Sequence, residues 1–578
     1  MRLGPHPPKP RKRTRRGFAV ALSSSLLAVG LWAGPAAAAT AYHVDCQAGN
    51  DANSGTSPTA AWRTIARANQ VTYQPGDQLL LKRGCSWSGT GFRANGNGSP
   101  AAPVVVADYG TGTLPQIVGV GAHEPAVLLQ NVQNWTLRNL DLTQSGQTPQ
   151  GIDDAGKDTD QRSDETMRAV VHILGLGPVG VVNCGEACTV RNIRLEALKV
   201  HDGSWNGIYS GAGFYQLGTN RFGYVDNVVV QGVESWNNHK AGVDFTSTYT
   251  KAISYPTTNV KVLGSHLHDN GADGIVMGPV DHGLMDGNQC SFNGRLRDAR
   301  LGCWSWDSHD VVIQFSESHH NMTPQNDKGA RDGGGYDCDL GSEDCLIQYS
   351  WSHDNQGEGF LLMQWPIGFG YKRGQTHNIQ LRYNVGERDG KKLAGGIYIF
   401  GGPNPVIINN NTIYYEPDRA DVSEMVCSEG AAICYDTFGK SGTPTGFVYN
   451  NVFITNGTVN PGVPANNSWT DGTGSWTFDN NLWFRVGGGL RYVVGNTTLT
   501  TFAAWQARGF DPNGLSADPM VVGPLGGGPS AYRLQAGSPA INRGRNVTVG
   551  LRGMGTRDYF GNPIPQGTTF DVGAHEAG

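Results

Sequence analysis

Short segments of alternating apolar and polar residues recur between about residues 188 and 415. One copy begins at residue 227 with Asn-Val-Val-Val-Gln-Gly-Val-Glu-Ser-Trp-Asn-Asn, and similar segments begin at residues 259, 344 and 378. After a polar turn, each is followed by a shorter apolar segment that is entered through glycine, and the copies lie about 24 to 34 residues apart. Because residues two apart on a strand share a face, each copy predicts two short strands joined by a turn.

A single copy cannot bury its own apolar face, so the copies must stack on one another. Repeats made of short strands without helices predict a parallel β-helix, in which neighbouring rungs lie about 4.8 Å apart. A β-propeller is the alternative, but each blade needs about four strands per repeat. The alternation predicts that four residues point inward, namely Val243, Ile275, Phe360 and Ile397.

The residues that follow these inward positions form two outward columns along the stack. The first column reads Tyr209, Asp244, Val276, Trp304, Asp337, Leu361 and Tyr398, and the second reads Gly211, Thr246, Gly278, Trp306, Asp339, Met363 and Phe400. Asp273 and Glu358 precede glycines at the start of the same face.

Aromatic rings beside acids suit a sugar ligand, because sugar rings stack on aromatic faces and carboxylates accept hydroxyl hydrogen bonds. The substrate-binding residues that we expect are Trp304, Trp306, Tyr398, Asp244, Lys240 and Arg331. The alternative is that a loop or the C-terminal segment covers these aromatic side chains.

The densest acidic cluster spans residues 331–339 and reads Arg-Asp-Gly-Gly-Gly-Tyr-Asp-Cys-Asp, with Glu358 one rung later. Adjacent rungs place side chains about 5 Å apart, close to the carboxyl separation of retaining glycosidases. One carboxyl group protonates the leaving oxygen while the other attacks the sugar or activates water. We therefore expect Asp337 and Glu358 to form the catalytic pair, assisted by Asp332, Asp339 and Asp273.

Two other interpretations of the cluster remain open. Oxygen-rich loops bind calcium, so Asp332, Asp337 and Asp339 could form a calcium site. The acids could also be a solvated turn without a chemical role. Apart from calcium, the chemistry of paired carboxylates requires no cofactor.

The N-terminal residues 1–39 predict a secretory signal peptide. The basic stretch 11–16 precedes the apolar run 18–32 and the small residues 36–39. Residues 14–18 also resemble a twin-arginine signal, so export by either route is expected. The apolar run is too short for a stable membrane span, although a membrane anchor is the alternative interpretation.

Ten cysteines behind an export signal predict extracellular disulfide bonds, and a zinc site is the alternative. Pairing between neighbours along the chain is the simplest scheme, which joins Cys46 to Cys85, Cys184 to Cys188, Cys290 to Cys303, Cys338 to Cys345, and Cys427 to Cys434.

The charge excludes several classes of partner. The whole chain has 578 residues and a net charge of −5, and the signal segment holds seven basic residues and no acids. The rest of the chain has 37 basic and 49 acidic residues, a net charge of −12. Nucleic acid and anionic membrane surfaces are therefore not expected partners. We expect a secreted extracellular monomer acting on a polysaccharide or oligosaccharide.

Motifs near both ends of the chain accompany the repeat. They are Tyr42-His-Val-Asp-Cys-Gln-Ala-Gly-Asn-Asp, Gly55-Thr56, Trp62-Arg-Thr-Ile-Ala-Arg-Ala-Asn, Ala517-Asp-Pro, Tyr532-Arg-Leu-Gln-Ala-Gly-Ser-Pro-Ala-Ile-Asn, and Asp571-Val-Gly-Ala-His-Glu. Together with the repeat they resemble the right-handed β-helix carbohydrate enzymes of the pectin-lyase type. The resemblance implies an all-β, single-stranded right-handed parallel β-helix and a secreted carbohydrate-active enzyme.

The resemblance also implies a division of the chain. An N-terminal cap of the β-helix spans residues 40–100 and contains a short capping helix at 62–69. The β-helix core spans residues 101–480, and a C-terminal closing segment spans residues 481–578.

The type of reaction depends on one position. The β-helical pectate lyases with a lysine base carry an acidic calcium cluster followed by Gly-x-Gly-Phe-Lys. This chain resembles them at Gly357-Glu358-Gly359-Phe360 but has Leu361 where they have lysine. Lys240, Lys328 or Arg331 would have to replace that base, and the polygalacturonase motifs are absent as a set. We therefore expect a glycoside hydrolase, with a polysaccharide lyase second and a non-catalytic glycan-binding β-helix third.

The histidines are expected to be structural. His201, His268 and His353 each precede an aspartate, and the last two fall at equivalent turns of the repeat. His319-His320 adjoins the insertion 321–334, which we expect to overhang the acidic groove.

Overall fold

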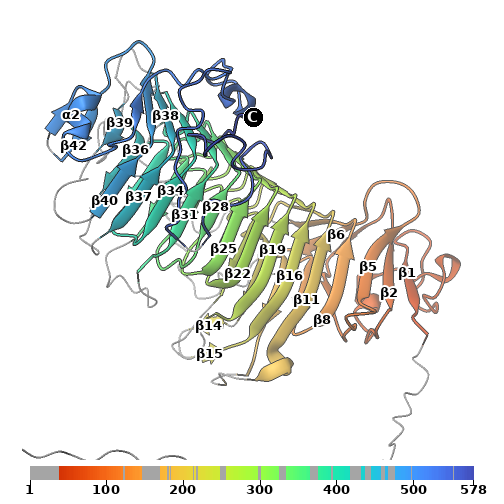
Figure 1. Cartoon of the computed structure of the whole chain (residues 1–578). Coiled ribbons are helices and arrows are strands. Elements are labelled where there is room, and N and C mark those ends of the chain that lie inside the picture. The colour runs from red at the N-terminus through yellow and green to blue at the C-terminus, as the bar shows by residue number, and fades with distance from the viewer. Residues whose placement is uncertain are drawn as a thin grey trace, which may run out of the picture. The chain divides into compact units, whose positions relative to one another are not determined.

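The computed structural model (Figure 1) describes most of the chain beyond the predicted signal peptide. The described residues are 38–121, 124–145, 169–178, 181, 184–212, 214–216, 219–247, 255–296, 301–323, 333–364, 375–391, 395–416, 431–436, 444–456, 463–466, 475–495, 497–550 and 552–578. Residues 39–578 form one compact unit.

Within the described residues, three 14-stranded sheets run along this unit. From β2 to β42, each turn of the chain contributes one strand to each sheet. Sheet 1 contains, in spatial order, β1 (Ala41–Val44), β2 (Gln78–Lys82), β5 (Val104–Tyr109), β8 (Gln133–Arg138), β11 (Thr189–Glu196), β16 (Tyr224–Gln231), β19 (Thr257–Leu263), β22 (Val280–Asp286), β25 (His309–Gln314), β28 (Leu346–Gln348), β31 (Ile379–Arg382), β34 (Val406–Asn409), β37 (Thr445–Tyr449) and β40 (Ser475–Asp479).

Sheet 2 contains β3 (Ser86–Ser88), β6 (Gln116–Val120), β9 (Asp141–Ser145), β12 (Lys199–His201), β17 (Glu234–Trp236), β20 (His266–His268), β23 (Gln289–Ser291), β26 (Glu317–His319), β29 (Trp351–His353), β32 (Val385–Glu387), β35 (Thr412–Tyr415), β38 (Val452–Thr455), β41 (Leu482–Arg485) and β44 (Leu515–Ser516). Sheet 3 contains β4 (Phe92–Arg93), β7 (Val127–Gln130), β10 (Ala169–Gly175), β13 (Asn206–Ala212), β18 (Val243–Thr246), β21 (Ile275–Gly278), β24 (Cys303–Ser305), β27 (Tyr336–Cys338), β30 (Phe360–Met363), β33 (Ile397–Phe400), β36 (Ala431–Asp436), β39 (Val463–Asn466), β42 (Tyr492–Val494) and β43 (Thr497–Leu499).

Strand pairing within the three sheets is parallel, except that β42 and β43 are antiparallel. Two further strands, β14 (Phe214–Gln216) and β15 (Thr219–Arg221), form an antiparallel hairpin. The helices are α1 (Ile65–Ala68), α2 (Phe502–Gln506) and the 3-10 turns Pro58–Ala60, Gly185–Cys188 and Pro529–Tyr532. The arrangement confirms the predicted all-β parallel β-helix.

The sheets extend beyond the predicted core segment 101–480. Strands β1 to β4 already belong to the three sheets, although the sequence assigned their residues to a cap. At the other end, β41 to β44 belong to the sheets although they lie within the predicted closing segment. Helix α1 lies inside the predicted helix at 62–69.

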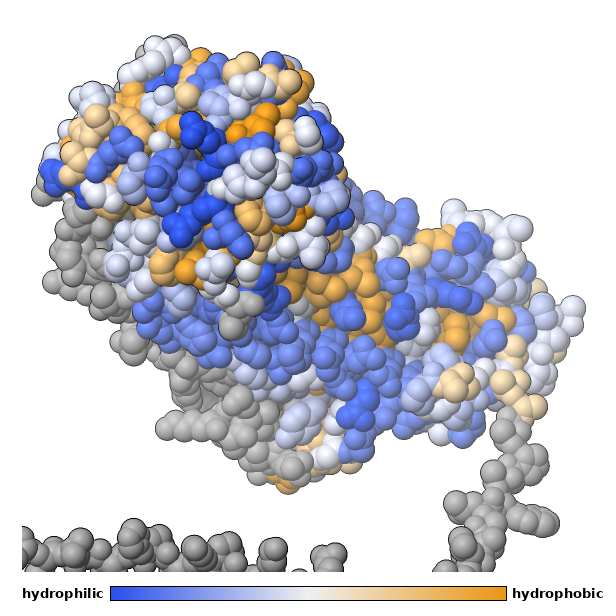
Figure 2. All heavy atoms as spheres, in the orientation of Figure 1, coloured by the Kyte–Doolittle hydropathy of each residue, from blue (hydrophilic) through white to orange (hydrophobic). Residues whose placement is uncertain are grey.

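Apolar side chains from all three sheets fill the interior. The predicted inward residues Val243, Ile275, Phe360 and Ile397 are fully buried in the same hydrophobic cluster. On sheet 1 the outward positions mix charged residues, such as the exposed Arg194 and Lys261, with partly exposed apolar residues, such as Leu284 and Val312. Accordingly, the face over β11 to β25 shows hydrophilic and hydrophobic areas side by side (Figure 2).

Two ladders of buried asparagines line the turns at either end of sheet 2. In the first, each side-chain amide donates to the side-chain oxygen of the next rung, through Asn238, Asn270, Asn293, Asn321, Asn355 and Asp389. The second runs in the same way through Asn384, Asn411, Asn451, Asn481 and Asp511. These bonds satisfy buried polar groups in the turns, where the sheets provide no backbone partners.

The residues that follow β44 fold back over the outer surface of sheet 2 and reach sheet 1 (Figure 1). Ala531, Tyr532, Leu534 and Ala540 pack there against an apolar patch formed by Val385, Tyr414, Val452, Ile454 and Leu482. On sheet 1, Arg382 donates to the backbone oxygen of Arg552, at 2.7 Å. We call residues 517–578 the closing strap.

Four of the predicted disulfide bonds are confirmed. They join Cys46 to Cys85, Cys184 to Cys188, Cys290 to Cys303, and Cys338 to Cys345. Cys434 is also disulfide-bonded, while its expected partner Cys427 lies outside the described residues. No helix within the described ranges has the length and apolar character needed to cross a membrane.

The end of the first asparagine ladder predicts a pH effect on stability. Burial raises the pKa of Asp389 from 3.8 to about 7, against opposing hydrogen bonds from Asn355. The unfolded chain ionises this carboxyl group near pH 4, so folding stability falls as the pH rises from about 4 to about 7. Asp389→Asn removes this penalty while keeping the side-chain shape.

We expect Asp389→Asn to be more stable than the parent at pH 8, by on the order of 4 kcal/mol, and to match it at pH 4. Denaturant unfolding of both proteins at the two pH values measures the difference. Parallel pH profiles for the two proteins would show that Asp389 is ionised in the folded state.

Candidate functional site

The outer face of sheet 3 brings together most of the predicted site residues. Register pairs Asp244 with Val276, Val276 with Trp304, Trp304 with Asp337, Asp337 with Leu361, and Leu361 with Tyr398. The first outward column read from the sequence is therefore confirmed residue by residue. Its members differ in exposure, since Asp337 is fully buried and Tyr398 is partly exposed.

A further column lies just before these strands and contains Ala241, Asp273, Leu301, Gly334, Glu358 and Gly395. Backbone hydrogen bonds connect the members of this column. The N–H of the residue that follows each member donates to the carbonyl oxygen of the member on the next rung. Examples are Gly335 to Glu358 at 2.9 Å and Gly359 to Gly395 at 3.3 Å. Glu358 thus lies between two glycines on the neighbouring rungs. A Cβ atom at Gly334 would lie 3.2 Å from Oε1 of Glu358. The missing side chains leave room for the Glu358 carboxylate.

The predicted catalytic pair therefore occupies adjacent rungs. Glu358 precedes β30 by two residues, while Asp337 lies in β27 and pairs with Leu361. Glu358 lies beside Gly334, and Asp337 lies three residues after Gly334 on that rung. The two acids are therefore not directly opposite each other, as the expected separation of about 5 Å required. Both are almost completely buried, at 0% exposure for Asp337 and 2% for Glu358.

Asp273 is held by the neighbouring tryptophan. Nε1 of Trp304 donates to Oδ1 of Asp273 at 2.8 Å, and the backbone N–H of Leu301 points to the same oxygen at 3.3 Å. Trp304 is only 7% exposed and packs with Ala241 and Leu301. The Trp304 ring is therefore mostly covered and bonded to Asp273, so it does not offer the open stacking surface that the sequence predicted.

Trp306 is partly exposed and packs on the edge of this small cluster. A Cβ atom at Gly278 would lie 2.5 Å from Nε1 of Trp306, so the indole lies over a glycine of the preceding rung. This arrangement leaves Trp306 as the better candidate for stacking on a sugar.

The rung that contains β18 carries an ion pair. Nζ of Lys240 donates to Oδ2 of Asp244 at 2.7 Å, and the Thr246 hydroxyl donates to the other oxygen. Asp244 is fully buried. On the rung before β13, burial lowers the pKa of His172 to about 4, so this histidine is neutral at pH 7 and does not supply a proton.

The later rungs add an acid that the sequence analysis missed. The Tyr398 hydroxyl donates to Oδ2 of Asp436 at 3.0 Å. Asp436 pairs in register with Phe400 and so continues the second outward column by one rung. Extending the columns past Tyr398 to the Cys434-Tyr435-Asp436 segment would have found it.

The cluster around residue 337 is described only in part. The backbone N–H of Leu340 donates to Oδ1 of Asp339 at 2.5 Å, and Asp339 is partly exposed. Arg331, Asp332 and Lys328 lie outside the described residues. The predicted calcium trio of Asp332, Asp337 and Asp339 therefore stays a prediction.

The predicted structural histidines lie on sheet 2, away from these acids. His268, Ser291, His319 and His353 pair in register along successive rungs. Their equivalence in the repeat is confirmed, but they end the strands β20, β26 and β29 instead of occupying turns.

Comparison with known proteins supports the fold. A family model described as "Right handed beta helix region" matches residues 254–413. The chain is 24% identical to Lacto-N-biosidase of Bifidobacterium longum over 91% of its own length and 36% of that protein, so it spans about a third of this relative. It is 37% identical to Alpha-1,3-galactosidase A of Akkermansia muciniphila over 65 residues, 11% of each chain.

A solved structure, the GH136 lacto-N-biosidase from Eubacterium ramulus, superposes with a TM-score of 0.51 at 21% identity, over 65% of this chain and 64% of that one. These matches establish a right-handed parallel β-helix, as the resemblance implied.

Proposed function

We propose that this protein is a secreted, monomeric glycoside hydrolase that cleaves an extracellular oligosaccharide or polysaccharide on the outer face of sheet 3. The observation that carries the proposal is that two buried carboxyl groups, Asp337 and Glu358, lie on adjacent rungs, three positions apart along the strand direction. The similarity to Lacto-N-biosidase along 91% of the chain supports the same class of reaction.

Hydrolysis of a glycosidic bond needs one protonated carboxyl group and one ionised group. We assign these two roles to Asp337 and Glu358. We assign assisting roles to Asp273, which is bonded to the indole N–H of Trp304, and to Asp339. Asp332 is assigned the same role from the sequence.

We assign substrate binding to the partly exposed rings of Trp306 and Tyr398, which lie on the rungs of β24 and β33. The ion pair of Lys240 with Asp244 offers polar groups for sugar hydroxyls further along the groove. Arg331 is assigned to binding from the sequence alone.

The same face argues against elimination. A lyase needs a base that removes the proton beside a uronate carboxylate, and the position that carries lysine in the resembling lyases holds Leu361, which is 2% exposed. Of the three residues that could replace this base, Lys240 is the one within the described residues. Its Nζ is bound to Asp244 at 2.7 Å, so it is not available for this role. Hydrolysis is therefore favoured over a polysaccharide lyase and over a non-catalytic glycan-binding protein.

The test is incubation of the purified secreted protein with a panel of glycans that includes lacto-N-biosides and α-galactosides. New reducing ends without ultraviolet absorbance near 235 nm are expected from a hydrolase. Absorbing products would show a lyase, and a protein that binds the glycans but releases no product would contradict the proposal.

A further inference from the structure

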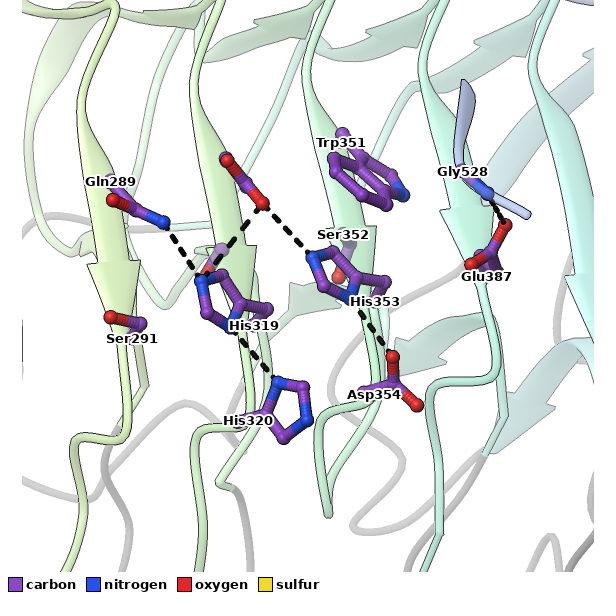
Figure 3. A network of polar contacts seen from close by, with 12 residues as sticks. Gln289, Ser291, His319, His320, Trp351, Ser352, His353, Asp354, Glu387 and Gly528 are labelled. Atoms are coloured by element: carbon purple, nitrogen blue, oxygen red, sulfur yellow. Dashed lines mark hydrogen bonds and ion pairs between the residues drawn. The ribbon is translucent and has the colours of Figure 1, made fainter. Parts of the chain in front are cut away.

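The outer face of sheet 2 carries a line of histidines that the reaction on sheet 3 does not use. From β29 onward the closing strap packs on this face, and its Arg557 lies over the ring of Phe315, just before β26. Gly528 lies against the ring of Trp351, and its N–H donates to Glu387 at 3.0 Å. His319 and His353 therefore lie at the border of the strap (Figure 3).

Three potential ligand atoms meet at this border. Glu317 and His319 are two apart on β26 and share its outer face, and His353 pairs with His319 from β29. Oε1 of Glu317 lies 3.1 Å from Nε2 of His353 and 3.9 Å from Nε2 of His319. The two imidazole rings are nearly parallel, with centroids 4.7 Å apart.

These separations suit a metal ion. Ligands about 2.1 Å from a tetrahedral zinc ion are about 3.4 Å from one another. The observed 3.1 and 3.9 Å lie on either side of that value, so small side-chain rotations close the site. All three atoms lie within 4.8 Å of one another.

The other nitrogen of each ring is held by a further side chain (Figure 3). Nδ1 of His353 lies 2.9 Å from Oδ2 of Asp354. The Asp354 carboxylate also pairs with Arg388 through Oδ2 and with Lys391 through Oδ1, at 2.7 Å each. Nδ1 of His319 lies 2.9 Å from Nδ1 of His320. Metal-bound histidines are oriented in this way, because the second hydrogen bond fixes the ring and its tautomer.

Nε2 of His319 also contacts Gln289, which lies on the neighbouring rung opposite to that of His353. The side-chain amide nitrogen of Gln289 lies 3.0 Å from Nε2 of His319. An amide N–H₂ group only donates, so Nε2 is the acceptor and carries the lone pair. A metal ion would take the place of this donor.

We propose that Glu317, His319 and His353 form a zinc-binding site on the outer face of sheet 2, separate from the acids of sheet 3. Two imidazole nitrogens and one carboxylate oxygen are a donor set that suits zinc, and water completes the coordination. The ion joins β26 to β29 at the border of the closing strap, and so stabilises the folded chain.

The test uses the full secreted chain, stripped of metal and then titrated with zinc. We expect about one zinc ion per chain, a melting temperature that rises with zinc, and visible absorption when cobalt(II) replaces zinc. Glu317→Gln and His319→Ala are expected to weaken zinc binding at least about tenfold. Glu317→Gln is the safer variant, because the Glu317 side chain is 35% exposed and the chain should fold without it.

The control is His377→Ala, two residues before β31. The His377 side chain is 43% exposed and faces Glu343 at 3.5 Å. It should bind zinc like the parent. Absence of stoichiometric zinc from the parent, or zinc binding that survives both site variants, would overturn the proposal. The readout is metal binding and melting, so it is independent of glycan cleavage.

Discussion

Asp337→Asn and Glu358→Gln should each lower the rate of glycan cleavage by about a thousandfold or more, with little change in melting temperature. Each change keeps the size of the side chain and removes only its charge and its titratable proton. If these groups provide the acid and the base or nucleophile, the transition state loses several kcal/mol of stabilisation, which corresponds to about this drop in rate.

Turnover of each variant, measured alongside circular dichroism and thermal melting, tests this expectation. Asp518→Asn provides the matched control, because Asp518 is exposed, lies in the closing strap and should not affect the rate. Calcium and a chelator are added in separate arms. Partial recovery of the variants in millimolar calcium, with chelator inactivating the parent, would assign Asp337 to a calcium site instead. Near-normal turnover in both variants would end the proposed mechanism.

Asn451→Ala should destabilise the fold by on the order of 5 kcal/mol. The Asn451 side chain is fully buried in the second ladder. Its amide donates to Ile408, Tyr449 and Asn481 at 2.9 to 3.0 Å, and its oxygen accepts from the backbone and side chain of Asn411. Truncation leaves several buried partners without hydrogen bonds, and each costs about 1 to 3 kcal/mol.

Denaturant unfolding compares Asn451→Ala with Asn95→Ala. Asn95 is exposed, and its amide reaches the Thr72 hydroxyl at 3.0 Å, so its loss should change stability by no more than about 0.5 kcal/mol. Equal effects of the two substitutions would mean that water replaces the ladder bonds and that the ladder does not hold the turns.

Much of the fold could be predicted because a parallel β-helix repeats one local rule. Alternation at Val243, Ile275 and Phe360 gave the interior, and the residue after each gave the outward column with Trp304 and Asp337 in the correct register. Neighbouring cysteines paired as expected for the same reason, because residues close in sequence on one or two rungs are close in space.

What the repeat does not contain could not be predicted from it. The burial of Trp304 depends on Leu301 and Ala241 around it, and alternation says only that it points outward. The asparagine ladders need the turns of distant rungs to coincide, as Asn411 and Asn451 do across 40 residues of chain. The closing strap has no repeat at all, so its position on sheet 2 follows from tertiary packing alone.

The closing strap also changes how the molecule should respond to mechanical load. In a plain solenoid each rung contacts only its neighbours, so tension at one end unzips rungs one after another. Here the strap bonds to several rungs at once. The backbone oxygens of Arg543, Arg545 and Asp571 accept from the side chains of Asn480, Asn450 and Asn410, respectively. The backbone N–H of Gly528 donates to Glu387. Tension on the C-terminus is shared among these rungs in shear, and the last rung cannot peel away by itself. We therefore expect the strap to slow unfolding more than it raises the equilibrium free energy of unfolding.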